Sequence, residues 1–308
     1  MRRTILLKEQ LRWIFHHITK SQDFAPLESS LKALAKSNLK REIKQVDEIQ
    51  GFDLPTLKKY IQLHEPLLMK GAAKDWECLK WTAKSLSDAY PLETAVSTSD
   101  QEMSELSLEK SLKNLESKKI GENSRVSHII QNNEQLQVEM NIKALKSVMG
   151  FPHIVTSFQF FFGQKGNVTK LHAGATNNLQ IGIQGVKKWH LIAPKYAPIV
   201  RPIINGEPLL SSCQDTSIPD YSRFPEQEYV PITEVIHEKG DILFIPTFYW
   251  HQVMYEDAVM SSGVRWISPY SLIKSSFTML FVMLTSTNPS FVLSLYRIML
   301  GKNAPFFK

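Results

Sequence analysis

The most informative run in the chain is Gly240-Asp241-Ile242-Leu243-Phe244-Ile245-Pro246-Thr247-Phe248-Tyr249-Trp250-His251. Its apolar residues 242–245 stand between a glycine and a proline, which predicts a short buried strand. Further short runs, rich in β-branched or aromatic residues, occur at 180–183, 188–192, 234–236, 251–254 and 263–267, after an alternation of Phe158, Phe160 and Phe162. Many short strands separated by turn signals predict an antiparallel barrel or a double-sheet sandwich.

Helices are expected at both ends of the chain. The apolar spacing in the first forty residues predicts two amphipathic helices, and residues 277–284 and 291–300 predict a second pair. Each member of this C-terminal pair is shorter than the roughly 20 apolar residues needed to cross a bilayer. We expect the pair to cover the core or form a dimer rather than to anchor the chain on a membrane surface.

Charge and cysteine content argue against several classes of protein. Over 308 residues, 36 Lys and Arg against 30 Asp and Glu give a net charge of +6 that is spread along the chain. No nucleic-acid partner is therefore expected. The two cysteines, Cys78 and Cys213, lack disulfide-framework or zinc spacing, and the apolar triplet at 5–7 is broken at once by charged residues. These features predict a cytoplasmic protein.

Two other stretches complete a pattern with the run at 240–251. They are Gly166-Asn167-Val168-Thr169-Lys170-Leu171-His172-Ala173-Gly174 and Gln184-Gly185-Val186-Lys187-Lys188-Trp189. In order and spacing, the three resemble the JmjC and cupin-like Fe(II)/2-oxoglutarate oxygenases, especially the branch of the asparaginyl hydroxylase that acts on hypoxia-inducible factor. Tyr221-Ser222-Arg223-Phe224-Pro225 and residues 66–81 extend the resemblance.

The resemblance implies a fold and a division of the chain. The fold is mainly β with flanking helices, a double-stranded β-helix of the jelly-roll or cupin type over residues 42–271. Residues 1–41 would form N-terminal helices, and residues 272–308 a helical segment that makes a homodimer. Residues 97–127 match poorly and are rich in Ser, Glu, Lys and Asn, so we expect an exposed insertion that adds little to the core.

The resemblance also implies an iron site, with one departure. Fe(II) that activates oxygen is held by two imidazoles and one carboxylate, which leaves positions for a keto acid and oxygen. The family places the first histidine and the carboxylate in an H-x-D/E motif, because alternate residues of a strand point the same way. Here the motif reads His172-Ala173-Gly174, so the carboxylate is missing, and the distal histidine is His251. Alone, either histidine would be an ordinary core or surface residue.

Co-substrate residues follow by the same resemblance. Lys187, fifteen residues after His172, would pair with the distal carboxylate of 2-oxoglutarate, and Thr169 and Asn178 would also contact it. By sequence alone, Lys187 could equally be a surface lysine, and the other two would be turn residues. Val264 stands where the family enzyme has an asparagine.

Gly174 allows three outcomes. A chloride or bromide could take the vacated position, as in Fe(II)/2-oxoglutarate halogenases; water could take it, giving a hydroxylase; or the chain could be a catalytically silent binding module. A glycine in a strand costs about 0.5–1 kcal/mol against alanine, so drift after loss of function would more readily leave another residue. We therefore expect an enzyme, with halogenation ahead of hydroxylation, that acts on a small molecule or a protein side chain.

Overall fold

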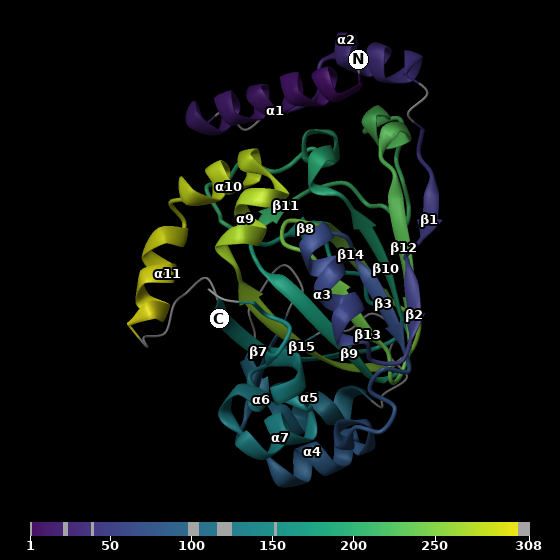
Figure 1. Ribbon diagram of the computed structural model, residues 1–308, viewed down its shortest axis with the longest axis vertical. Helices are drawn as coiled ribbons and strands as arrows, with labels where there is room; N and C mark the ends of the chain where they lie inside the picture. Colours follow the sequence, from purple (N-terminus) through teal and green to yellow (C-terminus); the bar gives the residue numbers. More distant parts are fainter. Residues whose placement is uncertain are drawn as a thin grey trace.

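The computed structural model (Figure 1) describes residues 2–20, 24–37, 40–97, 105–115, 125–150 and 153–300. Its strands are β1 (Ile43–Gln45), β2 (Glu48–Gln50), β3 (Leu67–Lys70), β4 (Thr94–Ser97), β5 (Glu105–Ser107), β6 (Arg125–Ser127), β7 (Ile154–Gly163), β8 (His172–Ala173), β9 (Asn177–Gln184), β10 (Lys187–Ile192), β11 (Leu210–Ser211), β12 (Ile232–His237), β13 (Ile242–Ile245), β14 (Trp250–Tyr255) and β15 (Val259–Ile267). Its α-helices are α1 (Arg2–Ile18), α2 (Glu28–Lys36), α3 (Leu54–Leu63), α4 (Ala83–Ala89), α5 (Leu108–Leu115), α6 (Ile129–Asn132), α7 (Glu134–Glu139), α8 (Ile142–Lys146), α9 (Pro269–Ser275), α10 (Phe277–Leu284) and α11 (Phe291–Met299).

Two sheets face each other and form the predicted double-sheet architecture. The six-stranded minor sheet has the order β1-β12-β10-β14-β8-β11, and the nine-stranded major sheet has the order β2-β3-β13-β9-β15-β7-β6-β4-β5. Trp189 and Leu191 of the minor sheet pack with Leu243 and Ile245 of the major sheet in one buried cluster. This arrangement is a cupin-like jelly roll, the fold that the family resemblance implied, and it includes the double sheet that the strand pattern predicted. The sheets are mixed, because β1 and β2 join their neighbours in parallel.

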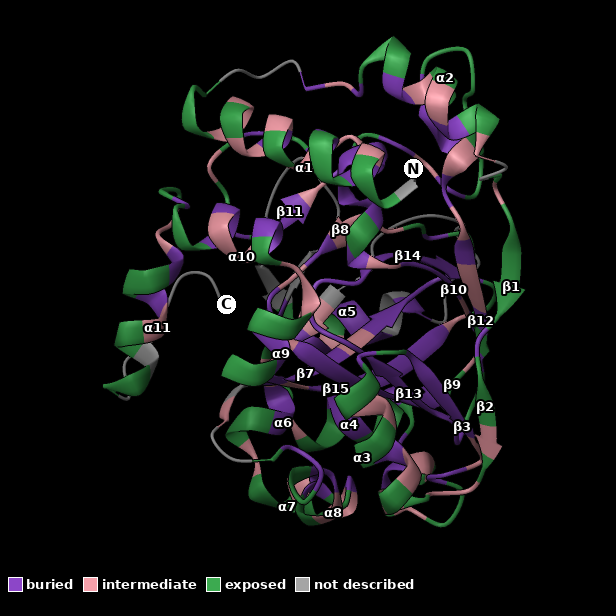
Figure 2. Ribbon diagram, turned by 45° about the horizontal axis from the view of Figure 1, so that its top comes forward, coloured by how far each residue is buried: buried purple, intermediate pink, exposed green. Residues whose placement is uncertain are grey.

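The outer face of the major sheet is covered by the helices between β3 and β7. Phe158, Phe160 and Phe162 of β7 alternate onto this face and are buried in a cluster that includes residues of α4 to α8. Figure 2 shows the consequence as a continuous buried layer through the strands with exposed helix surfaces outside it. The alternation noted in the sequence therefore marks one face of a strand, as the period of two requires.

The expectation that residues 97–127 add little to the core is wrong for their described part. Strands β5 and β6 extend the major sheet, and α5 packs into the cluster beneath it. Its leucines are all buried: Leu108, Leu112 and Leu115. Spacings of four and three place these leucines on one helix face, which average composition hides. The rest of this predicted insertion, 98–104 and 116–124, lies outside the described residues.

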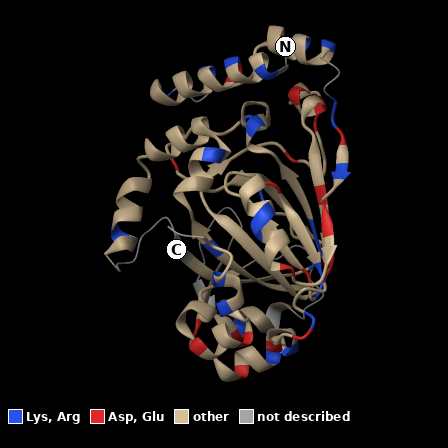
Figure 3. Ribbon diagram, viewed as in Figure 1, with Lys and Arg blue, Asp and Glu red and all other residues tan. Residues whose placement is uncertain are grey.

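Helices from both termini pack together at one end of the sheets. Met279, Val282 and Met283 of α10 are buried in a cluster that also contains Leu6 and Trp13 of α1. Helix α10 therefore covers the core, whereas α11 leaves several apolar side chains exposed: Val292, Leu293, Tyr296 and Met299. Among the described helices, none combines the length and apolarity that a membrane crossing requires. Figure 3 shows basic and acidic residues intermingled over the described fold.

Candidate metal centre

The two predicted histidine ligands lie side by side on neighbouring strands. His172 of β8 is paired directly with His251 of β14, although 79 positions separate them in the sequence. Directly opposite residues of an antiparallel pair project from the same face. Their ring centroids are 4.1 Å apart and the ring planes are inclined by 56°. The structure therefore brings the two imidazoles close enough to share one ion.

Hydrogen bonds define which nitrogen of each ring is available. Nδ1 of His172 lies 2.7 Å from the carbonyl oxygen of Lys170, and Nδ1 of His251 lies 3.0 Å from that of Tyr249. Because a carbonyl oxygen only accepts, each Nδ1 carries the proton and donates it. In a neutral ring the lone pair is then on Nε2, the form in which histidine binds a metal.

Burial keeps both rings in this neutral form. Loss of solvation lowers the pKa of His172 to about 4, and the positive charge of Arg265 contributes to the shift. The pKa of His251 is also well below its usual value, first because of burial and then because of His172 and Arg265. At neutral pH the two side chains therefore present neutral nitrogen donors.

Gly174 follows β8 and lines the same small cavity as the histidines. The cavity volume is about 20 Å³, enough for a water-sized species. A Cβ built on Gly174 would meet only Leu209 Cδ1, at an ordinary contact distance of 3.8 Å. Residue 174 thus has room for a side chain and carries none, so the cavity is open where the family motif supplies a carboxylate.

The protein offers no substitute acid in this part of the structure. The ten residues around the cavity are His172, Gly174, Thr176, Asn178, Leu209, Ile245, Pro246, Tyr249, His251 and Arg265, and none is Asp or Glu. Within the described ranges, no group of three His, Cys, Asp or Glu side chains could hold a metal ion. A metal at this position would have two protein ligands, and other species would fill the remaining coordination positions.

The predicted co-substrate residues divide into two sets. Asn178 of β9 lines the histidine cavity, and its Oδ1 accepts a hydrogen bond from Gln180 Nε2 at 3.0 Å. Thr169 lies outside the lining, and its hydroxyl accepts a bond from the backbone N–H of Val253 at 2.9 Å. Thr169 therefore ties the segment before His172 to the strand that carries His251.

Lys187 points into the space between the sheets, beyond the histidine cavity. Its ammonium group donates to Ser261 Oγ at 2.6 Å and lies 4.9 Å from the ring centroid of Tyr255. The residue is 3% exposed, so its position between the sheets excludes a surface role. Burial, followed by the charge of Arg265, lowers its pKa to about 7. In its protonated form Lys187 is thus a buried cation whose contacts with Ser261 and Tyr255 are both uncharged.

Arg265 is a site residue that the sequence analysis missed. It belongs to β15, where it is the only charged residue, and it lines the cavity with His172 and His251. Its pKa is lowered by burial to about 10, so it remains a cation at neutral pH. The lone arginine in the strand predicted at 263–267 was the available signal, because charged residues are rarely buried unless they have a partner.

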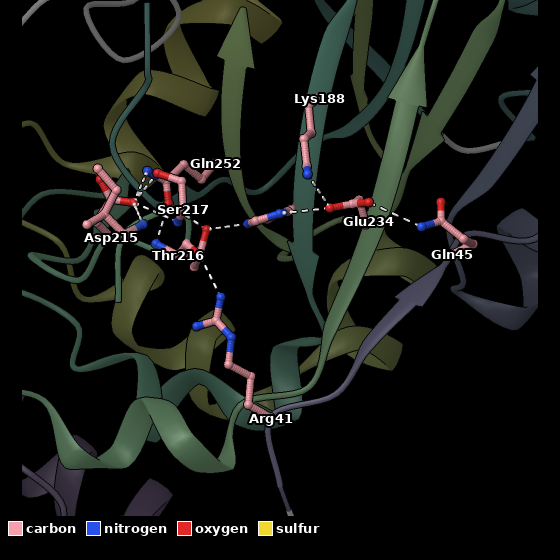
Figure 4. Close-up of polar contacts among 10 residues, drawn as sticks. Arg41, Gln45, Lys188, Asp215, Thr216, Ser217, Glu234 and Gln252 are labelled. Carbon is pink, nitrogen blue, oxygen red and sulfur yellow. Dashed lines mark hydrogen bonds and ion pairs between the residues drawn. The ribbon is translucent and has the colours of Figure 1, made fainter. Parts of the chain in front are cut away.

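His190 received an ordinary structural interpretation, and the structure agrees with it. Its ring lies on the outer face of the minor sheet, with Nδ1 2.9 Å from Thr216 Oγ1 and Nε2 3.4 Å from Glu234. Gln252, next to His251, accepts hydrogen bonds from both the N–H and the hydroxyl of Thr216. Figure 4 shows this network, which also contains Lys188 bound to Glu234 and Arg41 bound to the backbone at Thr216. It fixes β14 from outside while His251 faces inward.

The sequence of this chain is similar to those of several known proteins. Residues 54–267 match the family described as Cupin-like domain. JmjC domain-containing protein D of Dictyostelium discoideum is 36% identical over 94 residues, which cover 30% of this chain and 21% of that protein. Human HSPB1-associated protein 1 is 33% identical over 110 residues, 35% of this chain and 22% of that protein.

A third relative carries an activity in its name. The chicken 2-oxoglutarate and iron-dependent oxygenase JMJD4 is 28% identical over 120 residues, 37% of this chain and 27% of that protein. The matched stretches thus span about a fifth to a quarter of the length of these three relatives. The family match covers well over half of the 308 residues, so the chain belongs to the cupin-like domain family.

Proposed function

We propose that this chain is a non-haem Fe(II)- and 2-oxoglutarate-dependent enzyme that oxidises a C–H bond. The observation that carries the proposal is the pair of opposed imidazoles, each held by its Nδ1 so that both Nε2 atoms are available for one ion. The relative named as a 2-oxoglutarate and iron-dependent oxygenase supports this class of chemistry. The closer affinity to the asparaginyl hydroxylase branch remains part of the proposal.

The site supplies two of the three protein ligands that Fe(II) has in the resembling family. Neutral imidazole is a suitable ligand for iron, and His172 and His251 would hold the ion. Iron bound there would supply oxygen activation, with the keto acid as the co-substrate that is oxidised. Lys187 would pair with the far carboxylate of 2-oxoglutarate inside the fold, where a charge-assisted hydrogen bond is strong. Asn178 would contact the same co-substrate from the cavity wall, and Thr169 would hold the segment that carries His172.

Gly174 determines the finer choice of reaction. Because no side chain fills this position, a small exogenous ligand could occupy it beside the metal. We propose a halide there, chloride or bromide, and thus carbon halogenation; water in the same place would give a hydroxylase. The substrate is proposed to be a small molecule or a protein side chain.

One observation favours a different class of function. Arg265 places a positive charge beside the two histidines, and like charge opposes the binding of a dication. If this repulsion dominates, the fold is a binding module with no catalysis.

Anaerobic titration of the metal-free protein with Fe(II) and 2-oxoglutarate separates these functions. The enzyme predicts a coloured iron–keto acid complex that is lost in His251→Ala and retained in His153→Ala, whose histidine is outside the cavity. Chloride shifts the absorption band if it binds the iron. Absence of colour at saturating iron would refute the enzymatic proposal and favour the binding module.

The exposed face of α11 supports a further proposal, that two copies associate through residues 272–308. Val292, Leu293 and Tyr296 are each more than half exposed, which is unusual for large apolar side chains gathered on one helix. Light scattering at micromolar concentration should show a dimer that Leu293→Glu dissociates. Leu92→Glu, at a residue that is 93% exposed and lies outside this segment, serves as a charge-matched control. A monomeric wild type contradicts the proposal.

The cytoplasmic location of the protein stays a prediction from its sequence.

A further inference from the structure

Helix α1 has apolar residues on two sides. On the inner side, Leu6 and Trp13 are buried in the cluster that they share with residues of α10. On the outer side, spacings of four, four and three residues place four large side chains in one stripe: Leu7, Leu11, Phe15 and Ile18. Their exposed fractions are 55%, 59%, 64% and 62%. The helix is therefore attached to the fold by one face and exposes a second apolar face.

The length of this outer stripe makes it unusual. Single exposed apolar residues are ordinary on a protein surface, whereas a contiguous apolar patch marks an interaction site. The stripe extends over residues 7–18, or about 17 Å along the helix axis at 1.5 Å per residue. In Figure 1, α1 lies at the outer edge of the molecule, beyond α10. The stripe is therefore accessible to a partner along its full length.

The exposed charged residues along α1 are all positive. Arg3 and Lys8 are exposed, and Glu9, the single acidic residue of the helix, is fully buried. Among the neighbouring helices, α10 has no charged residue, and the single acid of α2, Glu28, is paired with Lys32. Acidic and basic residues intermingle over the fold as a whole, so this combination of exposed apolar and cationic groups is a property of α1.

Shape and charge distinguish the possible partners of this face. A peptide helix docks into a groove, whereas the residues that line the surface pocket beside the stripe all belong to α1 itself: Thr4, Leu7, Lys8, Leu11, Arg12, Phe15 and His16. A second copy that met this face by two-fold symmetry would bring the cations of both chains into one interface, where like charges repel. A membrane surface needs no groove, and its anionic lipids attract cations.

We propose that the outer face of α1 binds the surface of a membrane that contains anionic lipids. The four apolar side chains of the stripe insert among the lipid headgroups, and Arg3 and Lys8 contact the acidic groups of the lipids. With 17 residues that include charged ones, α1 lies in the plane of the membrane and does not cross it.

This membrane face is separate from the other proposed surfaces. The expectation against a membrane anchor concerned residues 277–284 and 291–300, whereas the proposed face belongs to α1. It leaves the exposed side of α11 available for the proposed dimer. Anionic lipids are typical of the cytoplasmic leaflet, which agrees with the predicted cytoplasmic location. The inference goes beyond the proposed catalytic function and does not depend on it.

Co-sedimentation of the full chain with vesicles tests the proposal. Vesicles of equal parts phosphatidylcholine and phosphatidylserine are compared with vesicles of phosphatidylcholine alone. The wild type should bind the mixed vesicles about tenfold or more tightly, because each cation near an anionic surface strengthens binding roughly fivefold. High salt should weaken this preference, since it screens the charges.

Three variants assign the binding to the stripe and to its charges. Leu11→Gln keeps the charge and should weaken binding to mixed vesicles by about tenfold or more, because an apolar side chain no longer enters the lipid. Lys8→Gln should weaken binding to the mixed vesicles roughly fivefold and leave binding to neutral ones unchanged. Leu92→Gln, at a residue that is 93% exposed and lies outside α1, should bind as the wild type does. All three residues are exposed, so the melting temperatures should match that of the wild type.

The contrary outcomes are equally specific. Absence of binding to mixed vesicles in excess lipid, equal binding to neutral vesicles, or binding that Leu11→Gln leaves unchanged overturns the proposal. Light scattering that shows a complex of two copies, dissociated by Leu11→Gln but not by Leu293→Glu, overturns it too, because a second chain then covers the stripe. The proposed catalytic function stands or falls separately, on the binding of iron and 2-oxoglutarate.

Discussion

Gly174→Asp returns a carboxylate to the position where the family motif carries one. The backbone accepts the change, because a Cβ at residue 174 meets only Leu209 Cδ1 at 3.8 Å and φ lies outside the left-handed region. The new side chain would sit two residues after His172, at a position that lines the histidine cavity. We expect the variant to fold and to bind metal more tightly than wild type.

The magnitude follows from charge and solvation. Two unit charges 4 Å apart interact by about 4 kcal/mol at an effective dielectric constant of 20, and a dication doubles this to about 8 kcal/mol. Desolvation of the carboxylate removes several kcal/mol of that gain. A net gain of about 3 kcal/mol corresponds to roughly 10²-fold tighter binding.

The assay is Co(II) competition titration without chloride. Gly174→Asn has nearly the same shape without the charge, and Gly174→Ala has only the Cβ; both should bind Co(II) as wild type does. Gly174→Ala should also be more stable by about 0.5–1 kcal/mol, because glycine loses more backbone freedom on folding. Equal Co(II) affinity for the Asp and Asn variants would show that residue 174 does not face the metal. In turnover, the Asp variant should give hydroxylated and no halogenated product if wild type halogenates.

Four further predictions test the charges and the core. Lys187→Met should weaken 2-oxoglutarate binding by about 1.5–3 kcal/mol, or roughly 10- to 100-fold in calorimetry, because a buried charge-assisted hydrogen bond is lost. In wild type the same affinity should fall as pH rises above about 7, where Lys187 loses its proton, and a pH-independent affinity would contradict the assigned role. The melting temperature of the metal-free protein should fall as pH decreases from 6.5 toward 4: His172 and His237 have pKa values of about 4 when folded, so the unfolded chain binds more protons in that window. Leu112→Ala should destabilise the fold by about 2–5 kcal/mol in denaturant unfolding, whereas Leu92→Ala, at an exposed residue, should have little effect.

The sequence predicted the parts of the fold that have a local signal. Residues 242–245 were bounded by a glycine and a proline, and the strand has those same ends. A period of two was enough to predict β7 from its phenylalanines, and a period of about four was enough to predict α10 from its apolar residues. Helix α5 was missed as a core element because its leucines lie within a polar stretch whose average composition dominated the interpretation.

Site geometry depends on contacts that no local pattern contains. Spacing and resemblance selected His172 and His251, but their direct pairing depends on how β8 and β14 meet. The sequence left open whether Lys187 is buried or exposed, because it does not show that β10 lies between β12 and β14. Arg265 was missed because strand periodicity does not show which inward residue of β15 reaches the histidines. The register between strands that are distant in sequence therefore determines the pairing of the histidines, the burial of Lys187 and the position of Arg265.

The unusual charges of this site bear on whether it is functional. Burial of a cation is unfavourable unless an anion or strong hydrogen bonds compensate it, and this fold places both Lys187 and Arg265 around Phe161. A scaffold selected for stability alone would gain by replacing Lys187 with an apolar residue of similar volume. Retaining Lys187 is consistent with an anionic ligand that binds between the sheets and offsets the cost, the keto acid of the proposed function. On this reasoning, Lys187→Met should raise the stability of the ligand-free protein while it weakens 2-oxoglutarate binding, and a variant that is less stable would argue for a purely structural ammonium group.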